Sequence, residues 1–565
     1  MADIPARQRF PSDTSAGRTR YLVSGTLLLI LAAAVFHIAI VDYSADDGFI
    51  SFRYADHLAR GQGLVYNIGE RVEGYTNFLW VALLAAGRWA MPSVDLPQAA
   101  RSAGTAAALL IIVLTFRFAK TIAKGSTAAL LAGAFLAAHS SLAAWSGGGL
   151  ETSLFTLLVF AGASSYVSYR RTGRHLALSG ILFALAAMTR PDGVMFFAAT
   201  LLALMVSTYR RDGVRPAVRF AGAFLAMFVP YFIGRSLYFG DLFPNTAYAK
   251  VALGVAQLSR GARYVWNYVV EYGVLAWILP VLLYLWRSRE EWLWYFTGLI
   301  ALYLAYIVYV GGDGLAFHRF IAHIAPLIYT IAAAALVDFH RRYIATRTPA
   351  WVRTSVAGLS IAVVLALTAR STLVPVFAPE RVRWFEAQSQ LSFPGNGQDH
   401  SYVWFDNYFV DRLAAAARYL QQQAPPGSLV AATPAGAIAY YMDHPVIDML
   451  GLTDKHIARA KGVYQGGRVG GRAGHEKGDG AYVLSRAPDY ILMGNVAVFR
   501  EPLDEQAIQK KLVLKSEHEL WDIPEFHRRY ELVSVRLSNE GLFQYFTFFR
   551  KKPVAVSAIR EGDGR

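Results

Sequence analysis

Two adjacent carboxylates, Asp46 and Asp47, follow directly after the first long apolar run of the chain. A carboxylate held where a chain leaves a membrane is costly unless it is paired or solvated, and it can act as a general base toward a hydroxyl. The simpler alternative is that the two residues begin a helix, with Ser44 as its N-cap, because negative charge is favourable at a helix N-terminus. Taken alone, the residues leave both interpretations open.

Further polar motifs stand at the ends of later apolar runs: Gly147–Thr152, Thr189–Gly193, Phe243–Lys250, and Gly311–Gly314 followed by His318 and Arg319. Each motif has a structural alternative, since glycine and proline end helices tightly and Arg190 can pair locally with Asp192. If the apolar runs cross a membrane in turn, all four motifs lie on one face with Asp46 and Asp47. Guanidinium groups bind phosphate through two charge-assisted hydrogen bonds. Together the motifs predict a site that holds an anion and activates a hydroxyl.

The composition is that of a polytopic membrane protein. Of the 565 residues 55% are hydrophobic and only 17% are charged, whereas soluble domains carry about 25% charged residues. The chain has no cysteine, which excludes disulfides, thiolate metal sites and cysteine nucleophiles. The net charge of +15 lies in short clusters between apolar runs and forms no continuous basic face, so we expect no nucleic-acid partner.

Charge also predicts the topology. Residues 1–20 are polar and rich in arginine, so we expect a cytoplasmic tail. The run Tyr21–Val41 lacks a small-residue cleavage site and predicts an anchor, not a signal peptide. The run Tyr75–Met91 is close to the minimum spanning length, but a crossing there would move every later basic cluster outside. We therefore expect two juxtamembrane helices, one around Phe49–Leu58 and one over Tyr75–Met91, within an outer loop at 42–91.

The membrane domain is thus expected to cover residues 21–374 and to contain about 11 spans with basic inner loops. After Tyr21–Val41, the remaining spans are predicted at Pro97–Phe118, Ser126–Ala144, Leu150–Tyr169, His175–Thr189, Val194–Thr208, Phe220–Leu237, Tyr264–Trp286, Trp292–Val310, Phe320–Val337 and Ser355–Val374.

Residues 375–565 contain no run long enough to span. The stretch is large enough to fold as a separate α/β or α+β domain, which the span count places outside the membrane, in the periplasm. A helix is predicted at Asp411–Gln423, and the glycine-rich stretch Gly462–Gly480 predicts a loop. Strands are predicted at Ser428–Thr433, Val446–Leu450, Tyr490–Met493 and Leu542–Arg550.

The pattern resembles the integral-membrane glycosyltransferases of the GT-C fold. Within that class it is similar to the family of the mycobacterial terminal β-(1→2) arabinofuranosyltransferase and its bacterial relatives. The motifs that carry the resemblance are DDGFISFRYADHLARGQGLVYNIGERVEGYTNFLW, GGLET, TRPDG, FPNTAYAK, GGDG with HRF, VIDMLGLTDKHIARA and GHEK. They extend over nearly the whole chain.

The resemblance implies a transferase of the cytoplasmic membrane whose active site faces the periplasm. Its donor would be a polyprenyl-phosphate-linked sugar, with arabinofuranose suggested by the relatives, and its acceptor a hydroxyl on a glycan, glycolipid or protein, among membrane lipids. Asp46 or Asp47 would be the general base, with Asp46 preferred by a narrow margin. Positive groups would hold the donor phosphate, and further polar residues the sugar or acceptor. The phosphate candidates are Arg190, Lys250, His318 and Arg319, and the sugar or acceptor candidates are Glu73, Asn77, Asp448, Asp454 and His475.

No cofactor is certain from the sequence. Paired carboxylates with His318 or Asp313 leave a divalent cation open, although no metal-binding motif is recognisable. Two other classes of protein compete with the enzyme. A transporter would place polar residues near the bilayer midplane in repeated, broken helices, and we find no repeat. A non-catalytic protein that binds a lipid carrier would use the same pocket, and the paired carboxylates favour the enzyme over it.

Overall fold

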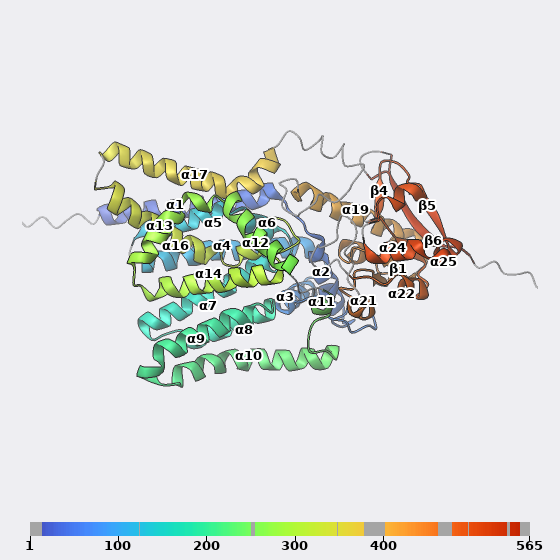
Figure 1. The fold of residues 1–565 in the computed structure, drawn as a ribbon, viewed down its shortest axis with the longest axis horizontal. Coiled ribbons are helices and arrows are strands. Elements are labelled where there is room, and N and C mark those ends of the chain that lie inside the picture. The colour runs from blue at the N-terminus through green and yellow to red at the C-terminus, as the bar shows by residue number, and fades with distance from the viewer. Residues whose placement is uncertain are drawn as a thin grey trace, which may run out of the picture.

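The computed structural model describes residues 14–553, apart from residues 124, 250–254, 347–348, 378–401, 461–476, 495, 513 and 540–542. It shows a bundle of long, roughly parallel helices and, beyond one end of it, a C-terminal unit built on a β-sheet (Figure 1). We call residues 402–553 the C-terminal unit and residues 42–91 the acidic loop. The predicted loop at Gly462–Gly480 falls mostly outside the described residues.

The helices that make up the bundle agree with the predicted apolar segments, and each predicted span falls on one helix or on consecutive helices. Their bounds are α1 (Thr14–Val41), α4 (Leu96–Ile122), α5 (Ser126–Ala138), α6 (Ser140–Gly147), α7 (Thr152–Thr172), α8 (Leu176–Thr189), α9 (Gly193–Asp212), α10 (Arg215–Phe239), α12 (Val255–Glu271), η1 (Val274–Ala276), α13 (Ile278–Arg287), α14 (Glu291–Val310), α15 (Arg319–Ala322), α16 (Ala325–Phe339), η2 (His340–Ile344) and α17 (Ala350–Phe377).

Length and composition support membrane crossing for only part of this bundle. Among the described residues, α1, α4, α10, α14 and α17 are long and apolar enough to cross a membrane. Helices α5 and α6 meet at an angle of 56° and add a sixth crossing if they form one broken span. Helices α3, α8 and α13 and the apolar part of α9 are shorter. The count of about 11 spans therefore stays a prediction.

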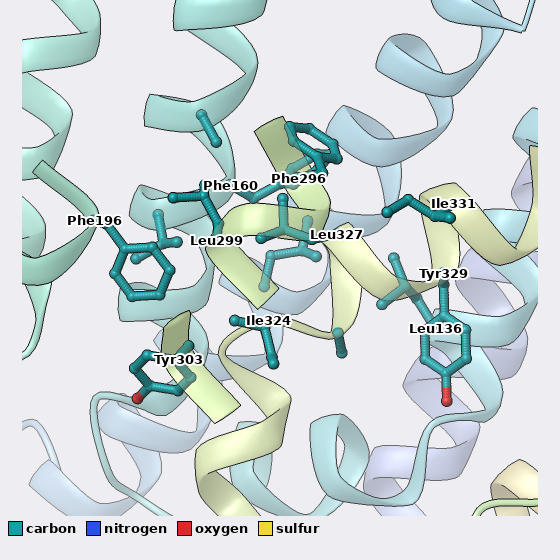
Figure 2. Close-up of a cluster of buried hydrophobic side chains, with 14 of the residues drawn as sticks. Leu136, Phe160, Phe196, Phe296, Leu299, Tyr303, Ile324, Leu327, Tyr329 and Ile331 are labelled. Carbon is teal, nitrogen blue, oxygen red and sulfur yellow. The ribbon is translucent and has the colours of Figure 1, made fainter. Parts of the chain in front are cut away.

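The bundle is held by tightly packed apolar and aromatic side chains. Phe196, Phe296, Leu299, Tyr303 and Leu327 lie together in its core (Figure 2). The helices α4 and α6 come so close that a Cβ at position 104 would meet the Ser146 carbonyl, so only glycine fits there. Such dense packing fixes the loops at the ends of the helices, where the polar motifs stand.

The acidic loop contains the two predicted short helices, α2 (Asp46–Ala59) and α3 (Phe78–Ala90). Ser44 is not the N-cap of α2, because Ala45 occupies that position and the Ser44 N–H donates to Asn407 Oδ1 instead. Nor is the polar side of α2 exposed, as an interfacial helix would require. Arg53 is only 4% exposed and donates to the carbonyls of Ala439, Met442 and His444 in the C-terminal unit.

The C-terminal unit contains a six-stranded mixed sheet in the order β2-β1-β3-β6-β4, with β5 paired to β6. The strand β1 runs parallel to β2 and β3, whereas β6 is antiparallel to its partners. The four predicted strands are confirmed as β1, β2, β3 and β6, and the predicted helix as α19, but β4 and β5 were not predicted. The strands are β1 (Val430–Ala432), β2 (Val446–Asp448), β3 (Tyr490–Leu492), β4 (Ala497–Phe499), β5 (Tyr530–Arg536) and β6 (Tyr545–Lys551).

Helices surround this sheet, and two short ones contact the rest of the chain (Figure 1). The helix α11 (Asn245–Ala249) of the bundle packs against α21 (Lys455–Arg459), and α2 packs against α20 (Ala437–Tyr440). These contacts join the two parts of the chain beside the acidic loop (Figure 1). The other helices of the unit are α19 (Tyr402–Gln423), α22 (Gly480–Ser485), α23 (Glu505–Gln509), α24 (Lys515–Asp522) and α25 (Pro524–Arg529).

Candidate active site

A cavity of about 550 Å³ lies where the acidic loop, the ends of the bundle helices and the C-terminal unit meet. It is lined by parts of all four polar motifs that the sequence singled out, together with the start of α2 and the stretch before α3. The C-terminal unit contributes one residue to the described lining, Leu452. The convergence expected from the sequence is thus present in three dimensions.

The two adjacent aspartates point to different places, since neighbouring helical residues lie about 100° apart. Asp47 lines the cavity, and within the described part of the chain its carboxylate has no hydrogen-bond or ion-pair partner. Asp46 does not line it. Its oxygens accept the N–H groups of Ala437, at 2.7 Å, and Gly436, at 3.2 Å. Burial raises the pKa of Asp46 to about 7. The geometry therefore favours Asp47, against the narrow preference for Asp46.

Arg190 lines the cavity from the turn between α8 and α9, and it is held by two carboxylates. Its Nη1 is 2.9 Å from Glu151 Oε1, and its Nε is 3.0 Å from Asp192 Oδ1. Asp192 also accepts the Tyr303 hydroxyl at 2.6 Å, which connects the pair to the bundle core of Figure 2. The local Arg190–Asp192 pair considered as a structural alternative is confirmed, and both residues nevertheless face the cavity.

Arg319 lines the cavity from the segment after α14 and is held in a similar way. Its Nε and Nη2 lie 2.7 Å and 3.3 Å from the two oxygens of Asp313. The guanidinium groups of Arg190 and Arg319 lie 5.1 Å and 5.4 Å from the centre of the same Phe320 ring. In each arginine one terminal nitrogen, Nη2 of Arg190 and Nη1 of Arg319, has no partner among the described residues. Terminal nitrogens of both arginines thus remain for a single anion.

The two residues of the acidic loop that were predicted to bind the sugar or the acceptor differ in position. Asn77 lines the cavity, where its Nδ2 donates to Glu151 Oε2 at 2.8 Å and to Ser51 Oγ at 3.0 Å. Glu73 does not line it. Its carboxylate is 4% exposed and accepts hydrogen bonds from the guanidinium group of Arg235 on α10. The structure therefore brings Asn77 to the site and places Glu73 in a buried ion pair.

The remaining candidates lie away from the cavity surface or outside the described residues. His318 is 2% exposed, packs among the rings of Tyr264, Tyr268 and Tyr272, and is not part of the lining. Lys250 and His475 lie outside the described residues.

The two aspartates proposed for the acceptor organise the backbone of the C-terminal unit. Asp448 accepts the N–H groups of Leu450, at 2.9 Å, and Thr453, at 2.8 Å. Burial raises the pKa of Asp448 to about 6. Asp454 caps α21 through the N–H groups of His456 and Ile457. Neither carboxylate lines the cavity.

Sequence reasoning assigned no role to Ser51 or Glu151, and it named Asp192 only as a local partner of Arg190 and Asp313 only in connection with a cation; all four line the cavity. Glu151, Asp192 and Asp313 stand in the motifs GGLET, TRPDG and GGDG, so the motif itself was the available signal. Glu151 connects Arg190 to Asn77. Arg190 is 39 positions and Asn77 is 74 positions from Glu151 in the chain, so no local pattern reveals this link. Within the described residues, no three His, Asp or Glu side chains form a group that could hold a metal ion.

The fold is that of a known class of membrane protein. The crystal structure of ArnT from Cupriavidus metallidurans bound to undecaprenyl phosphate superposes with a TM-score of 0.51 over 93% of this chain and 98% of that chain, at 12% sequence identity. The chain therefore has the GT-C fold of integral-membrane glycosyltransferases and is a multi-pass membrane protein.

Two further similarities concern the sequence. The terminal β-(1→2)-arabinofuranosyltransferase of Mycobacterium tuberculosis (strain ATCC 25618 / H37Rv) is 31% identical over 255 residues, which are 42% of this chain and 39% of that protein. The match thus spans about two fifths of the length of that relative. Residues 403–555, nearly the whole C-terminal unit, match the family model of a domain of unknown function (DUF8728).

Proposed function

We propose that the protein is a glycosyltransferase that moves a sugar from a polyprenyl-phosphate donor to an acceptor hydroxyl of the cell envelope. The observation that carries the proposal is the carboxylate of Asp47, which has no partner among the described residues, in a cavity that also presents one terminal nitrogen without a described partner from each of two arginines. A base and an anion site in one cavity are what transfer from a phosphate-linked sugar requires. The GT-C fold supports the same conclusion.

In the proposed reaction the acceptor oxygen attacks the anomeric carbon of the donor sugar. The bond between that carbon and the phosphate oxygen breaks, and polyprenyl phosphate leaves with the bonding electrons. Asp47 takes the proton from the acceptor hydroxyl. Arg190 Nη2 and Arg319 Nη1 donate to the phosphate, whose charge rises as it leaves, and charge-assisted hydrogen bonds of this kind strengthen with that charge.

The ion pairs of the two arginines change how they would hold the phosphate. Asp192 accepts from Nε of Arg190 and Glu151 accepts from its Nη1, so Nη2 is the nitrogen of Arg190 without a partner among the described residues. Asp313 occupies the edge of Arg319 formed by Nε and Nη2, and the edge formed by the two terminal nitrogens stays available to a phosphate. The carboxylates hold the guanidinium groups in position before the donor arrives, so little ordering is required at the moment of reaction.

The sugar and the acceptor are the finer part of the proposal. The mycobacterial relative supports an arabinofuranose donor, and its match to this chain includes neither the whole relative nor the whole chain. We propose a glycan, glycolipid or protein acceptor. Comparison of envelope glycans from a strain lacking the gene with those of its parent reports sugar and acceptor together, and unchanged glycans would count against the proposal.

The decisive experiment uses the purified protein with a synthetic polyprenyl-phosphate arabinofuranose and an arabinan oligosaccharide. We expect transfer to the oligosaccharide with release of polyprenyl phosphate. Donor binding without transfer, across sugars and acceptors, would instead indicate a protein that only binds a lipid carrier.

We also propose that the N-terminus is cytoplasmic and that the cavity and the C-terminal unit face the periplasm. The absence of native cysteines allows single cysteines to be labelled without background. Thr172 and Lys510 are both exposed, the first at the end of α7 and the second in the C-terminal unit. In intact spheroplasts an impermeant maleimide should label Lys510→Cys and not Thr172→Cys. The opposite pattern would reverse the orientation.

A further inference from the structure

The motif FPNTAYAK has no role in the reaction described above, although four of its residues, Phe243, Pro244, Thr246 and Ala247, line the cavity. Asn245 stands between them and is 4% exposed. Its backbone N–H donates to the Glu73 carbonyl at 2.9 Å. Glu73 directly precedes residues 74–77, which line the cavity. Asn245 is therefore fixed to the acidic loop through its backbone.

The side chain of Asn245 reaches in the other direction, into the C-terminal unit. Its Nδ2 lies 2.9 Å from the Gly451 carbonyl, 3.1 Å from the Leu452 carbonyl and 3.1 Å from the Asp454 carbonyl. Its Oδ1 accepts from Arg459 Nη1 at 3.1 Å. One buried amide thus connects two segments of the cavity wall that lie more than 200 positions apart in the chain.

We call residues 448–454 the junction loop. Asp448 sets its shape by accepting the N–H groups of Leu450 and Thr453, and Gly451 has a φ of +82°, a conformation that favours glycine. The loop ends where Asp454 caps α21. So constrained, it presents Leu452 to the cavity, the one described lining residue that comes from the C-terminal unit.

The side of the cavity on which Leu452 stands is the side away from the bundle. The phosphate of a lipid carrier stays with the membrane-spanning helices, where Arg190 and Arg319 are placed. An acceptor outside the membrane approaches from the C-terminal unit. This wall also differs in chemistry, because the side chain that the junction loop presents to the cavity, Leu452, is apolar, as suits an uncharged sugar.

We propose that Leu452 determines which acceptors fit the cavity and that Asn245 is the positioning residue that holds Leu452 in place. This inference rests on the proposed transferase activity and adds its acceptor wall. The size of a side chain in an apolar wall discriminates substrates by about 10–200-fold per methylene-scale change. Loss of the buried Nδ2 donor leaves three carbonyls to find other partners and shifts the junction loop.

The test compares Leu452→Ala, Leu452→Trp and Asn245→Asp with the unmodified protein, using one polyprenyl-phosphate sugar and two arabinan acceptors of different size. Leu452→Ala should shift the ratio of kcat/KM toward the larger acceptor by about tenfold, and Leu452→Trp should shift it the other way. Asn245→Asp keeps the acceptor for Arg459 but removes the donor to the three carbonyls. It should raise the KM for the acceptor about tenfold and change the KM for the donor less than twofold.

The matched control is Asn407→Ala. Asn407 also joins the C-terminal unit to the acidic loop, through the Ser44 N–H and the Asp42 carbonyl, but does not line the cavity. It should leave acceptor selectivity unchanged. An equal effect of Asn407→Ala would assign the change to loosened docking and overturn the positioning role. Unchanged selectivity in both Leu452 variants, with transfer intact, would overturn the inference itself. No transfer by the unmodified protein would overturn the proposed function instead.

Discussion

The cavity is bounded on one side by the loops of the bundle and on the other by the junction with the C-terminal unit, and these two sides are held by different forces. On the bundle side, Arg190 and Arg319 are fixed by ion pairs with Glu151, Asp192 and Asp313. On the junction side, Asn245 is fixed by hydrogen bonds to three backbone carbonyls and from Arg459, and the residue that faces the cavity is the apolar Leu452. A charged wall suits a phosphate whose charge changes, and a neutral wall suits sugar hydroxyls.

The ion pairs on the bundle side also keep the charges of Arg190 and Arg319 in fixed positions. A buried arginine without its carboxylates would be strongly destabilised, so the partners cannot be removed singly. Asp47, which lines the cavity from the first turn of α2 and has no such partner in the described chain, is the charge that remains for chemistry. The predictions below test this division of roles.

The largest effect is expected from Asp47→Asn. The amide keeps the shape of the carboxylate and removes the base, so turnover should fall by about 10²–10⁴-fold while donor affinity changes little. Asp46→Asn should reduce turnover less than tenfold, because Asp46 bonds to backbone N–H groups outside the cavity. The measurements are the transfer rate and the donor affinity of folded variants. Near-normal turnover of Asp47→Asn would remove Asp47 from the mechanism.

The second prediction concerns the charged wall. In Arg319→Lys the ammonium group cannot hold both oxygens of Asp313 and also reach the donor in the geometry of a guanidinium. The donor KM should rise by about 10–100-fold, as loss of a charged hydrogen bond implies. Arg319→Ala should raise the donor KM further. The control is Arg88→Lys, whose guanidinium pairs with Asp56 outside the cavity. Equal donor KM values in all variants would place the phosphate elsewhere.

The third prediction uses the raised pKa of Asp46, about 7 against an ordinary value of 3.8. Between these values the unfolded chain has an ionised Asp46 and the folded chain has a protonated one. Protons are then bound in excess by the folded state, so the free energy of unfolding falls as pH rises from about 4 to about 7 and levels off above. Asp46→Asn should remove this slope.

The measurement is the Tm of both proteins in detergent across that pH range. The buried Asp448, with a pKa of about 6, is common to both proteins and cancels in the difference. Parallel curves would mean that Asp46 is ionised in the folded protein throughout, and its role as a protonated, backbone-bonded carboxyl would need revision.

The smallest effect is expected from Asn77→Ala on the acidic loop. Asn77 faces the cavity as a neutral donor shared with Glu151 and Ser51, so its loss should lower kcat/KM by about 2–10-fold. The neighbouring Glu73→Gln should act on Tm and leave substrate KM values unchanged, because Glu73 is paired with Arg235 away from the cavity. A larger kinetic effect for Glu73 than for Asn77 would reverse this assignment.

Apolar length and charge alternation predicted the helices of the bundle, and β-branched and aromatic runs predicted four of the strands. The short apolar strand β4 (Ala497–Phe499) and the half-exposed β5 (Tyr530–Arg536) were missed, because their pairing with β6 is what makes them strands. Motif reasoning found Asp47, Asn77, Arg190 and Arg319, each of which lines the cavity.

Long-range partners explain why some candidate site residues lie outside the cavity. Glu73 pairs with an arginine 162 positions away, and Asp46 with backbone groups 390 and 391 positions away. No local pattern contains that information. Asp448 and Asp454 were assigned to the acceptor from the family resemblance, whereas in the structure both accept short-range hydrogen bonds from the next few N–H groups. A turn-forming aspartate and a ligand-binding one look alike in the sequence.

Arg53 has a consequence for biosynthesis. Its side chain sits 386 positions before the first of its carbonyl partners in the C-terminal unit, at Ala439. At translation rates of about 5–20 residues per second, those partners emerge about 20–80 s later. During that interval the acidic loop is already synthesised, and its central guanidinium group still lacks the three carbonyls that bury it. Completion of the nascent chain, and not insertion of the first helices, is then the step that assembles a competent active centre.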